Sequence, residues 1–577
     1  MTKNTPPSTQ TTLHILILLF LVLPFHGNTR KTKSKFSNIE PNILLSLKKQ
    51  WSNPSSLANW TRSSDHCKWS GITCTNGRVT KLEILNGTIT GTIPPAICDL
   101  KNLAHIDLQW NSILGPFPTV LYNCSKLEHL DLSQNYFIGT IPEDIYRLSP
   151  RLQYLNLEAN NFTGDIPSAI GRLLSLKSLQ LAENLFDGSF PPDIGNLLNL
   201  EELVMSYNAF APQPIPSSFT KLTKLRNLWM TETNLIGEIP DGIGNMSALE
   251  SVDLSVNSLN GSIPESLFLL KNLTILFLYY NELSGCIPRR VEALKLQVID
   301  LSNNTLTGTI PEDFGKLTSL TGLALFSNRL SGQVPSSIGR LPKLVDVGLW
   351  SNNLSGVLPP DFGLYSPLRT FQVCLNQFVG ELPKHLCENK VLIGVIAFAN
   401  KLTGELPESL GDCSSLIIIR VEDNRLSGPR FSMVEVMNNR FSGPIPAGIS
   451  SWGSVRAFRA SNNLLNGSIP QQLTSLTSLS LILLDGNNLA GPLPSPKIPW
   501  KNLTTLNLSR NNISGKIPAA LGLFSNLVYL DLSRNALSGQ VPQVFEKVAF
   551  NRSFLNNTNL CSNFQPLGLK RCHAKIV

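Results

Sequence analysis

A repeat of about 24 residues runs through most of the 577-residue chain and limits what the chain can fold into. Its template is L-x-x-L-x-L-x-x-N-x-L-x-G-x-I-P, seen plainly in LEHLDLSQNYFIGTIP (residues 127–142) and LTTLNLSRNNISGKIP (residues 503–518). The Asn of the template recurs mostly every 23–25 residues, which gives a column of twenty positions. These are Gly87, Asn111, Asn135, Asn160, Asn184, Asn208, Thr233, Asn257, Asn281, Asn304, Asn328, Asn352, Asn376, Asn400, Asn424, Asn439, Asn463, Asn487, Asn511 and Asn535.

The template predicts how each repeat folds. L-x-L forms a short strand whose leucines point inward, and the column Asn can hydrogen-bond the backbone of the turn, so that stacked copies form a ladder. Gly permits the bend, and Pro suits a segment leaving the sheet because it has no N–H. No repeat can bury its apolar face alone, so the repeats must stack. We therefore predict an α/β repeat solenoid, a leucine-rich-repeat superhelix with a parallel β-sheet on its concave side, over residues 79–542.

The ends of a solenoid need caps that cover the exposed core. Residues 37–78 and 543–577 depart from the template, and each contains a closely spaced cysteine pair. We predict an N-terminal cap and a C-terminal cap with its tail in these two segments.

One repeat near residues 425–440 is short. The I-P prolines lie 24 ± 1 residues apart as far as Pro407, but the next is Pro446, and 446 − 407 = 39. Two repeats would need 48, so nine residues are missing, and the segment GPRFSMVEVMNN lacks the outer I-P turn. A deleted or mis-spliced piece is the explanation we favour, and a naturally short repeat is the alternative.

Residues 13–25, LHILILLFLVLPF, form an apolar run of about 13 residues near the N-terminus. A membrane-spanning helix needs about 20, so we predict a secretory signal peptide over residues 1–27, with a buried core helix as the alternative. N-x-S/T sequons agree with export. The six that we expect to carry glycans are Asn59, Asn123, Asn161, Asn245, Asn272 and Asn353.

Eight of the ten cysteines fall into spaced pairs. Two pairs lie in the caps, and two others share a separation of 26 residues, which predicts four disulfides in an oxidising compartment. The pairs are Cys67–Cys74, Cys98–Cys124, Cys387–Cys413 and Cys561–Cys572. A metal site at Cys67 and Cys74 is the alternative, but no second Cys or His pair lies near them. Cys286 and Cys374 remain as predicted free thiols.

The net charge of +8 resides at the two ends of the chain. Residues 1–36 hold five bases and residues 561–577 hold three, with no acid in either segment. The remaining 48 − 8 = 40 bases balance the 40 acids of residues 37–560. A neutral body argues against a nucleic-acid partner.

Several motifs resemble the ectodomains of plant leucine-rich-repeat receptor kinases, and of the HAESA-like group in particular. They are WSGITC (residues 69–74), ICDLKNL (97–103), FPTVLYNCSKLEHLDLSQN (117–135), ESLGDCSSL (408–416) and RSFLNNTNLC (552–561). The resemblance covers residues 40–572 and implies a cell-surface receptor that binds a secreted peptide, with a shorter leucine-rich-repeat co-receptor kinase as a further partner. No kinase motif is present in the chain, so we predict no enzymatic activity and no cofactor.

A ligand site is expected on the concave positions, which are the x of L-x-L and the two residues before the column Asn. Most repeats from Trp229 to Phe398 place an aromatic there, over seven strand intervals of about 4.8 Å, or about 34 Å. That length suits an extended peptide of roughly ten residues. The alternative is that the rings only stack on one another. The predicted ligand-binding residues are Trp229, Phe277, Tyr279, Tyr280, Phe326, Trp350, Phe398, Arg420 and Arg459.

Arg420 could bind a carboxylate through a bidentate pair, or it could instead pair with Glu422 or Asp423. The receptor that gives the HAESA-like group its name carries an Arg-x-Arg pair that meets the terminal carboxylate of its peptide. The matching positions here are Ile418 and Arg420, so half of that motif is present, which makes a different ligand set plausible.

Two other classes of function are alternatives to a membrane-bound peptide receptor. A secreted decoy receptor, or a defence protein like the leucine-rich polygalacturonase inhibitors, would share the fold. An enzyme has little support, because the seven histidines are scattered in sequence and show no metal-ligand or nucleophile–base spacing, which predicts no metal site. The template explains the recurring Asp107, Asp131, Asp253, Asp300 and Asp531 better than acid–base catalysis does.

Overall fold

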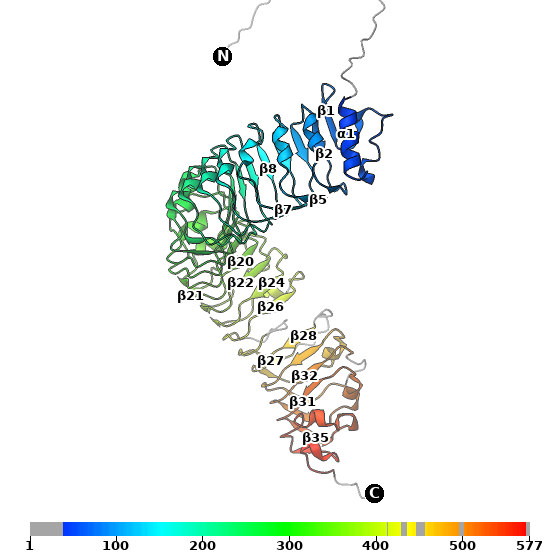
Figure 1. Ribbon diagram of the computed structural model, residues 1–577. Coiled ribbons are helices and arrows are strands. Elements are labelled where there is room, and N and C mark those ends of the chain that lie inside the picture. Colours follow the sequence, from blue (N-terminus) through cyan, green and yellow to red (C-terminus); the bar gives the residue numbers. More distant parts are fainter. Residues whose placement is uncertain (1–38, 412, 428–435, 446–455, 496–500, 573–577) are drawn as a thin grey trace, which may run out of the picture.

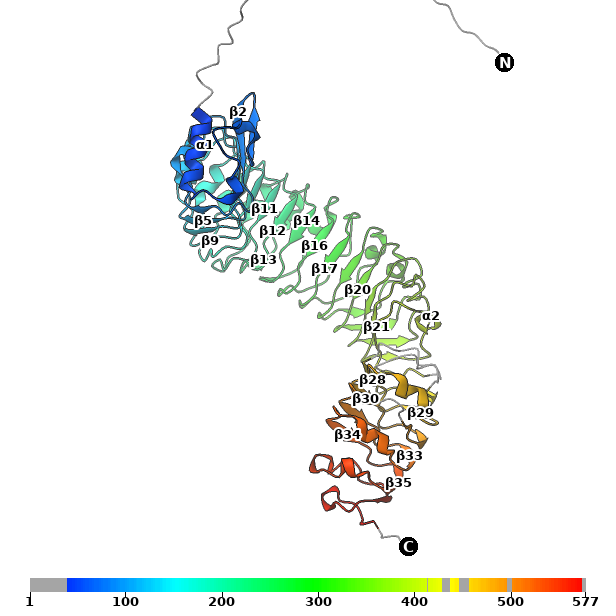
Figure 2. The same cartoon turned by 90° about the vertical axis from the view of Figure 1, so that its right-hand side faces the viewer.

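A computed structural model describes residues 39–411, 413–427, 436–445, 456–495 and 501–572. The chain forms a long, curved and twisted solenoid, with helix α1 (Ile39–Gln50) at one end and strand β36 (Asn559–Cys561) at the other (Figures 1 and 2). The signal-peptide prediction lies outside the described residues. Within those residues, no helix combines the length and the apolarity needed to cross a membrane.

The concave side is a β-sheet with one short strand from each repeat. Strand β1 pairs antiparallel with β2, and every later pair is parallel and in register. The first 16 strands are β1 Ile72–Thr75, β2 Arg78–Glu83, β4 His105–Asp107, β6 His129–Asp131, β8 Tyr154–Asn156, β10 Ser178–Gln180, β11 Glu202–Val204, β12 Asn227–Trp229, β14 Ser251–Asp253, β16 Ile275–Phe277, β17 Val298–Asp300, β18 Gly322–Ala324, β20 Asp346–Gly348, β22 Thr370–Gln372, β24 Gly394–Ile396 and β26 Ile418–Arg420. Four more continue beyond the short repeat: β28 Ala457–Arg459, β30 Leu481–Leu483, β32 Thr505–Asn507 and β34 Tyr529–Asp531.

A second set of short parallel strands follows the column Asn along one flank, and the sequence analysis did not anticipate it. These strands form where the x-L-x-G part of one repeat hydrogen-bonds the same part of the next. They are β3 Thr90–Gly91, β5 Ser112–Gly115, β7 Tyr136–Gly139, β9 Asn161–Phe162, β13 Ile236–Glu238, β15 Ser258–Asn260, β19 Ser331–Gly332, β21 Asn353–Val357, β23 Gln377–Gly380, β25 Lys401–Leu402, β27 Ser442–Pro444, β29 Leu464–Asn466, β31 Ala490–Pro492, β33 Asn512–Gly515, β35 Ala536–Gln540 and β36.

The helical elements of the repeats are 3₁₀ helices. Most begin directly after the I-P proline, which serves as an extended N-cap, and a run this short favours 3₁₀ over α geometry. The predicted α/β solenoid is confirmed with this refinement, and α2 (Glu408–Gly411) is a single α-helical turn. The 3₁₀ helices are Ser55–Leu57, His66–Lys68, Pro95–Asp99, Thr119–Asn123, Ile145–Arg147, Ser168–Arg172, Pro192–Asn196, Ser217–Lys221, Asp241–Asn245, Glu265–Leu269, Glu312–Lys316, Ser336–Arg340, Gln471–Ser475, Ala519–Leu523, Gln543–Phe545, Val548–Phe550 and Gln565–Leu567.

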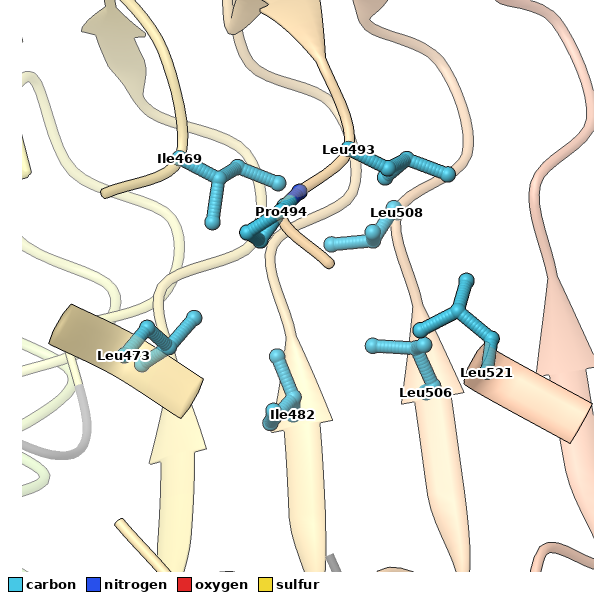
Figure 3. A pocket seen from close by; sticks show the side chains of 8 residues that line it. All are labelled: Ile469, Leu473, Ile482, Leu493, Pro494, Leu506, Leu508 and Leu521. Atoms are coloured by element: carbon cyan, nitrogen blue, oxygen red, sulfur yellow. The ribbon is translucent and has the colours of Figure 1, made fainter. Parts of the chain in front are cut away.

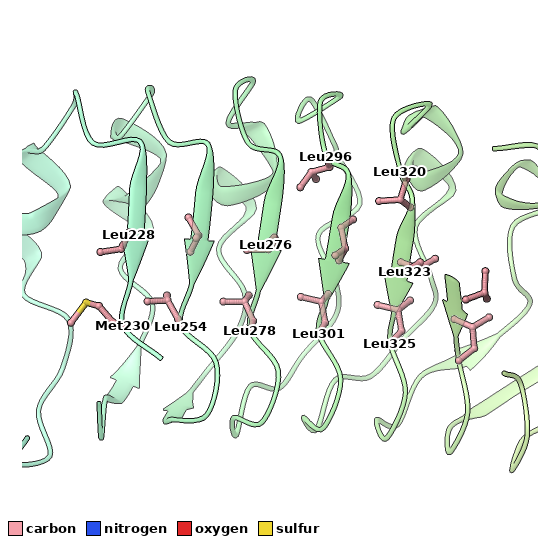
Figure 4. Close-up of a cluster of buried hydrophobic side chains, with 14 of the residues drawn as sticks. Leu228, Met230, Leu254, Leu276, Leu278, Leu296, Leu301, Leu320, Leu323 and Leu325 are labelled. Carbon is pink, nitrogen blue, oxygen red and sulfur yellow. The ribbon is translucent and has the colours of Figure 1, made fainter. Parts of the chain in front are cut away.

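The core is a continuous stack of template leucines. Leu276 and Leu278 lie beside Leu301 and Leu325 of the following repeats, all fully buried (Figure 4). The column asparagines form the expected hydrogen-bond ladder. In Asn281, Oδ1 accepts from the backbone N–H of Leu259 at 3.0 Å, and Nδ2 donates to the carbonyls of Leu254 and Leu278 at 3.0 and 3.1 Å. Each rung therefore ties two repeats together and leaves the buried amide satisfied.

The ladder crosses the short repeat without losing a rung. Asn439 comes only 15 residues after Asn424, yet its Oδ1 accepts from Leu426 N at 3.3 Å and its Nδ2 donates to Val421 O at 2.9 Å. The next rung, Asn463, donates to Val436 O at 2.8 Å. The described residues of the short repeat thus keep the hydrogen-bond rung that ties it to both neighbours.

Each cap closes one end of the core. Trp60 stacks on Trp69 with ring centroids 5.6 Å apart beneath α1. At the other end Asn557, which the sequence analysis did not include in the column, acts as a last rung by accepting from Leu537 N at 3.0 Å. The structure joins Cys67–Cys74, Cys98–Cys124, Cys387–Cys413 and Cys561–Cys572 and leaves Cys286 and Cys374 free, as the spacing indicates.

An apolar pocket lies inside the C-terminal part of the solenoid, between the concave strands β30 and β32 and two 3₁₀ helices (Figure 3). Its lining consists of Ile469, Leu473, Ile482, Leu493, Pro494, Leu506, Leu508 and Leu521. These side chains belong to the core and offer no polar group that could orient a ligand.

Candidate ligand-binding concave face

The concave strands present their outer residues to solvent and their middle residue to the core. In β12, Leu228 is buried while Asn227 and Trp229 face outward. The outward residues of successive strands line up in rows because the strands are parallel and in register; Trp229, for example, lies beside Asp253, and Asp253 beside Phe277. The predicted concave positions were the third residue of each strand and the two residues before the column Asn; the first residue of each strand shares the same face and was not predicted.

Seven aromatic residues form what we call the aromatic stripe: Trp229, Phe277, Tyr279, Tyr280, Phe326, Trp350 and Phe398. Trp229 is 39% exposed and Tyr280 is 59% exposed, and the other five are half-buried. Trp229 Nε1 donates to Ser251 Oγ at 2.9 Å, which fixes the indole against the next strand.

Ring contacts link part of the stripe. Phe326 stacks on Trp350 with centroids 4.4 Å apart, and Tyr279 contacts Phe277 and Tyr280 edge-on at 6.1 Å each. The stacking weighed as an alternative to ligand binding therefore exists for some members. It also holds the rings in place while leaving an aromatic surface on the concave side.

Arg420 lies at the C-terminal end of the stripe. Its guanidinium carbon is 4.3 Å from the centre of the Phe398 ring, and its Nε donates to Glu422 Oε1 at 2.9 Å. The pairing with Glu422, one of the alternatives considered, is thus present, whereas Asp423 accepts from Asn438 Nδ2 instead. Ile418, at the position of the first arginine of the pair, is 47% exposed.

Arg459 lies on the far side of the short repeat from Arg420. It is half-buried in β28, and its carbonyl accepts from Val436 N at 2.8 Å, while Asp423 N donates to Met437 O at 3.1 Å. The described residues therefore place one repeat between the strands that carry Arg420 and Arg459.

The recurring aspartates mainly brace turns. Oδ1 of Asp253 and Oδ1 of Asp300 each accept from the backbone N–H of the serine two residues later, at 3.0 and 2.9 Å. Burial raises the pKa of Asp300. The two carboxylates flank Phe277 in the same row, so they add negative charge to the middle of the stripe.

A second group of outward side chains lies near the N-terminal end, and we call it the polar stretch: His105, Asp107, His129, Asp131 and Tyr154. The rings of His105 and His129 stack at 3.9 Å, and Tyr154 stacks on His129 at 4.1 Å. Burial lowers the pKa of His129 to about 4, with His105 contributing, and burial also lowers the pKa of His105. Sequence reasoning missed this group, although the 24-residue separation of the two histidines was a signal for it.

The six predicted glycosylation sites lie off the concave sheet. Asn59, Asn123, Asn245 and Asn353 are exposed, and Asn161 and Asn272 are half-buried. Asn272 Nδ2 donates to Ser247 O at 3.1 Å. Their positions leave the concave face clear of these sequons.

The fold and this face define a leucine-rich-repeat solenoid with an exposed aromatic surface on its inner side. Family models agree, because the leucine rich repeat N-terminal domain matches residues 37–75 and leucine rich repeat models match residues 126–148, 150–210, 248–270, 295–317, 502–524 and 526–548.

One solved structure that the chain resembles is the Arabidopsis receptor kinase HAESA in complex with the peptide hormone IDA and the co-receptor SERK1. The two are 33% identical with a TM-score of 0.81, and the alignment covers 92% of this chain and 99% of that one. The chain therefore belongs to the plant leucine-rich-repeat receptor ectodomains.

Two curated relatives from Arabidopsis thaliana extend the comparison. Receptor-like protein 52 is 51% identical over 255 residues, which is 44% of this chain and 31% of that protein. Polygalacturonase inhibitor 1 is 37% identical over 92 residues, which is 15% of this chain and 27% of that protein. The matched segments span less than a third of these relatives' lengths.

Proposed function

We propose that the chain is the extracellular, peptide-perceiving module of a plant leucine-rich-repeat receptor, and that an extended secreted peptide lies along the aromatic stripe. The observation that supports the proposal is the row of fixed, solvent-facing aromatic rings across strands β12 to β24. Rings in exposed rows are strong candidates for binding hot spots. The similarity to HAESA, whose complex contains a peptide hormone, supports the same class of ligand.

Arg420 would lie at the carboxyl-terminal end of such a peptide. Its guanidinium already pairs with Glu422, so a peptide carboxylate would have to share or displace that partner. A shorter leucine-rich-repeat co-receptor kinase would then contact the bound peptide and the receptor together, by analogy with the co-receptor in the HAESA complex. Signalling would depend on that partner and on a kinase.

The experiment uses the secreted chain as bait for a pool of plant secreted peptides to which synthetic IDA is added. Retained peptides are identified by mass spectrometry, resynthesised and measured by calorimetry. We expect Tyr279→Ala and Trp350→Ala each to weaken binding at least about tenfold, which is about 1.4 kcal/mol. Trp110→Ala is the matched control, because Trp110 is an exposed concave aromatic outside the stripe.

Two outcomes would contradict the proposal. One is that no peptide in the pool is retained. The other is that both stripe variants bind a retained peptide as tightly as the unaltered chain does.

A secreted decoy or an inhibitor of cell-wall enzymes is the second candidate, favoured by the similarity to Polygalacturonase inhibitor 1. An inhibitor would retain a fungal polygalacturonase on an affinity column and reduce its activity. A peptide receptor would do neither.

A further inference from the structure

Two histidines and an aspartate meet on adjacent strands at the N-terminal end of the concave face. One ligand atom from each of His105, Asp107 and His129 lies within 4.8 Å of the other two. His105 and Asp107 are the outward residues of β4, and His129 is the first outward residue of β6. All three types of side chain can bind a metal through a nitrogen or an oxygen.

The repeat itself brings the two imidazoles together. His105 and His129 are 24 residues apart and directly opposite in the parallel register, with ring planes 9° apart. Two bonds of about 2.0–2.1 Å to one ion place their nitrogens roughly 3–4 Å apart. The ring centroids are 3.9 Å apart and the ring planes are nearly parallel, so the side chains must rotate before both nitrogen lone pairs, which lie in the ring planes, point at one ion.

The three potential ligands differ in how their surroundings hold them. The Asp107 carboxylate, 9% exposed, accepts from the N–H and the side-chain amide of Gln109 at 3.1 and 3.2 Å. His105 Nε2 lies 3.1 Å from a Glu83 oxygen but lacks the geometry of a hydrogen bond. In the described part of the chain, neither ring nitrogen of His129 has a hydrogen-bond partner. Asp107 therefore has the supporting hydrogen bonds that are typical of a metal ligand, whereas His105 Nε2 and both ring nitrogens of His129 are left available to an ion.

Charge favours a cation at this position. Glu83 lies opposite Asp107 with an oxygen 3.1 Å from His105 Nε2, and Asp131 lies opposite Asp107 in the next strand. Lys81 lies opposite His105, and its Nζ is 3.7 Å from the Glu83 carboxylate, which offsets its charge. Asp131 accepts from Ser133 and Asn156, so it is better placed to support the site than to bind the ion.

We propose that His105, His129 and Asp107 bind one divalent transition-metal ion, Zn²⁺ or Cu²⁺, with coordination positions open toward the concave side. Two imidazoles and a carboxylate suit these ions better than Ca²⁺ or Mg²⁺, which prefer oxygen ligands. The other cluster of metal-binding residue types, His66 with Cys67 and Cys74, is not a candidate because the two sulfurs form a disulfide.

The test is calorimetric titration of the untagged secreted chain with ZnCl₂ and, separately, with CuCl₂. We expect saturation at one ion per chain, and we expect His129→Phe to weaken binding by more than about 100-fold, beyond the loss typical of a supporting contact. Phenylalanine keeps a ring between His105 and Tyr154 but removes both nitrogens. His385→Phe is the control, because His385 pairs with Glu388 away from this face, and it should leave the titration unchanged.

Thermal melting is the second measurement. Zn²⁺ in excess should raise the melting temperature of the unaltered chain and of His385→Phe but not that of His129→Phe. If His129→Phe does not fold, Asp107→Asn provides the same comparison with a smaller change.

The proposal is overturned if the unaltered chain shows no saturable binding of either ion. It is also overturned if both His129→Phe and Asp107→Asn bind the ion as tightly as the unaltered chain. Because no peptide is present in these measurements, either result leaves the peptide-binding proposal unaffected.

Discussion

The polar stretch and the aromatic stripe are built on the same frame and differ only in their outward side chains. In both regions three-residue strands pair in register, the middle residue is buried and a column Asn accepts a hydrogen bond from the turn of the preceding repeat. The polar stretch presents two imidazoles, two carboxylates and one phenol, and the stripe presents mainly indole, phenyl and phenol rings. The comparison teaches that the template fixes the scaffold, while the positions it leaves free determine the chemistry.

The largest effect on the free energy of unfolding should come from the column asparagines, which both regions share. We expect Asn281→Ala, in the stripe, to lower the free energy of unfolding by about 1–3 kcal/mol, because it leaves the buried N–H of Leu259 without a partner, while the carbonyls of Leu254 and Leu278 each keep one hydrogen bond from a neighbouring column Asn. Asn135→Ala, in the polar stretch, should cost the same, since Asn135 accepts from Ile113 N and donates to the Leu108 and Leu132 carbonyls.

Urea denaturation followed by circular dichroism would measure both variants. Gln333→Ala is the control, because Gln333 is exposed on a flank loop, and it should stay within about 0.5 kcal/mol of the unaltered chain. If Asn135→Ala and Asn281→Ala differ by more than about 2 kcal/mol, the two regions do not share an equivalent frame.

The next largest effect should be on the rate at which Cys374 is alkylated. This residue occupies the same template position as Trp350 and Phe398 in the neighbouring repeats. Burial raises the pKa of its thiol to about 11, and the side chain is 4% exposed. At pH 8.5 the thiol is therefore mostly protonated, and we expect iodoacetamide to modify Cys374 at least about tenfold more slowly than the exposed Cys286.

The same measurement shows whether the stripe covers this thiol. In a Cys286→Ser background with the disulfides intact, Trp350→Ala should speed the modification of Cys374, and Trp110→Ala should not. Equal rates of modification for Cys374 and Cys286 in the unaltered chain would show that the stripe does not shield the Cys374 thiol from the reagent.

Much of the fold follows from the sequence because one template carries so much structural information. The leucines predict the stacked core, the column Asn predicts the ladder, and the cysteine spacing predicts the pairs that the structure joins. The flank strands escaped prediction because x-L-x-G has no strong strand pattern of its own and pairs only once the repeats are stacked.

The candidate site was less predictable. The position of the aromatic residues follows from the template, but the partner of Arg420 does not, because Glu422 and Asp423 are both close in sequence and only geometry selects Glu422. His105 and His129 were not predicted to meet, because metal-ligand and nucleophile–base motifs usually have short spacings in sequence. In a solenoid, neighbours across strands are one repeat apart, so a separation of 24 residues should be read as contact.

The smallest effect concerns ring stacking within each region. A double-mutant cycle on Phe326 and Trp350, whose centroids are 4.4 Å apart, should give a coupling free energy of about 0.5–1.5 kcal/mol in urea denaturation. The cycle on His129 and Tyr154, at 4.1 Å, should give a coupling of similar size because both pairs stack face to face across adjacent strands. Phe277 with Trp350 is the control pair, since two strands lie between them, and its coupling should be near zero. If coupling appeared in the stripe alone, stacking would be a special property of that region instead of a consequence of the shared register.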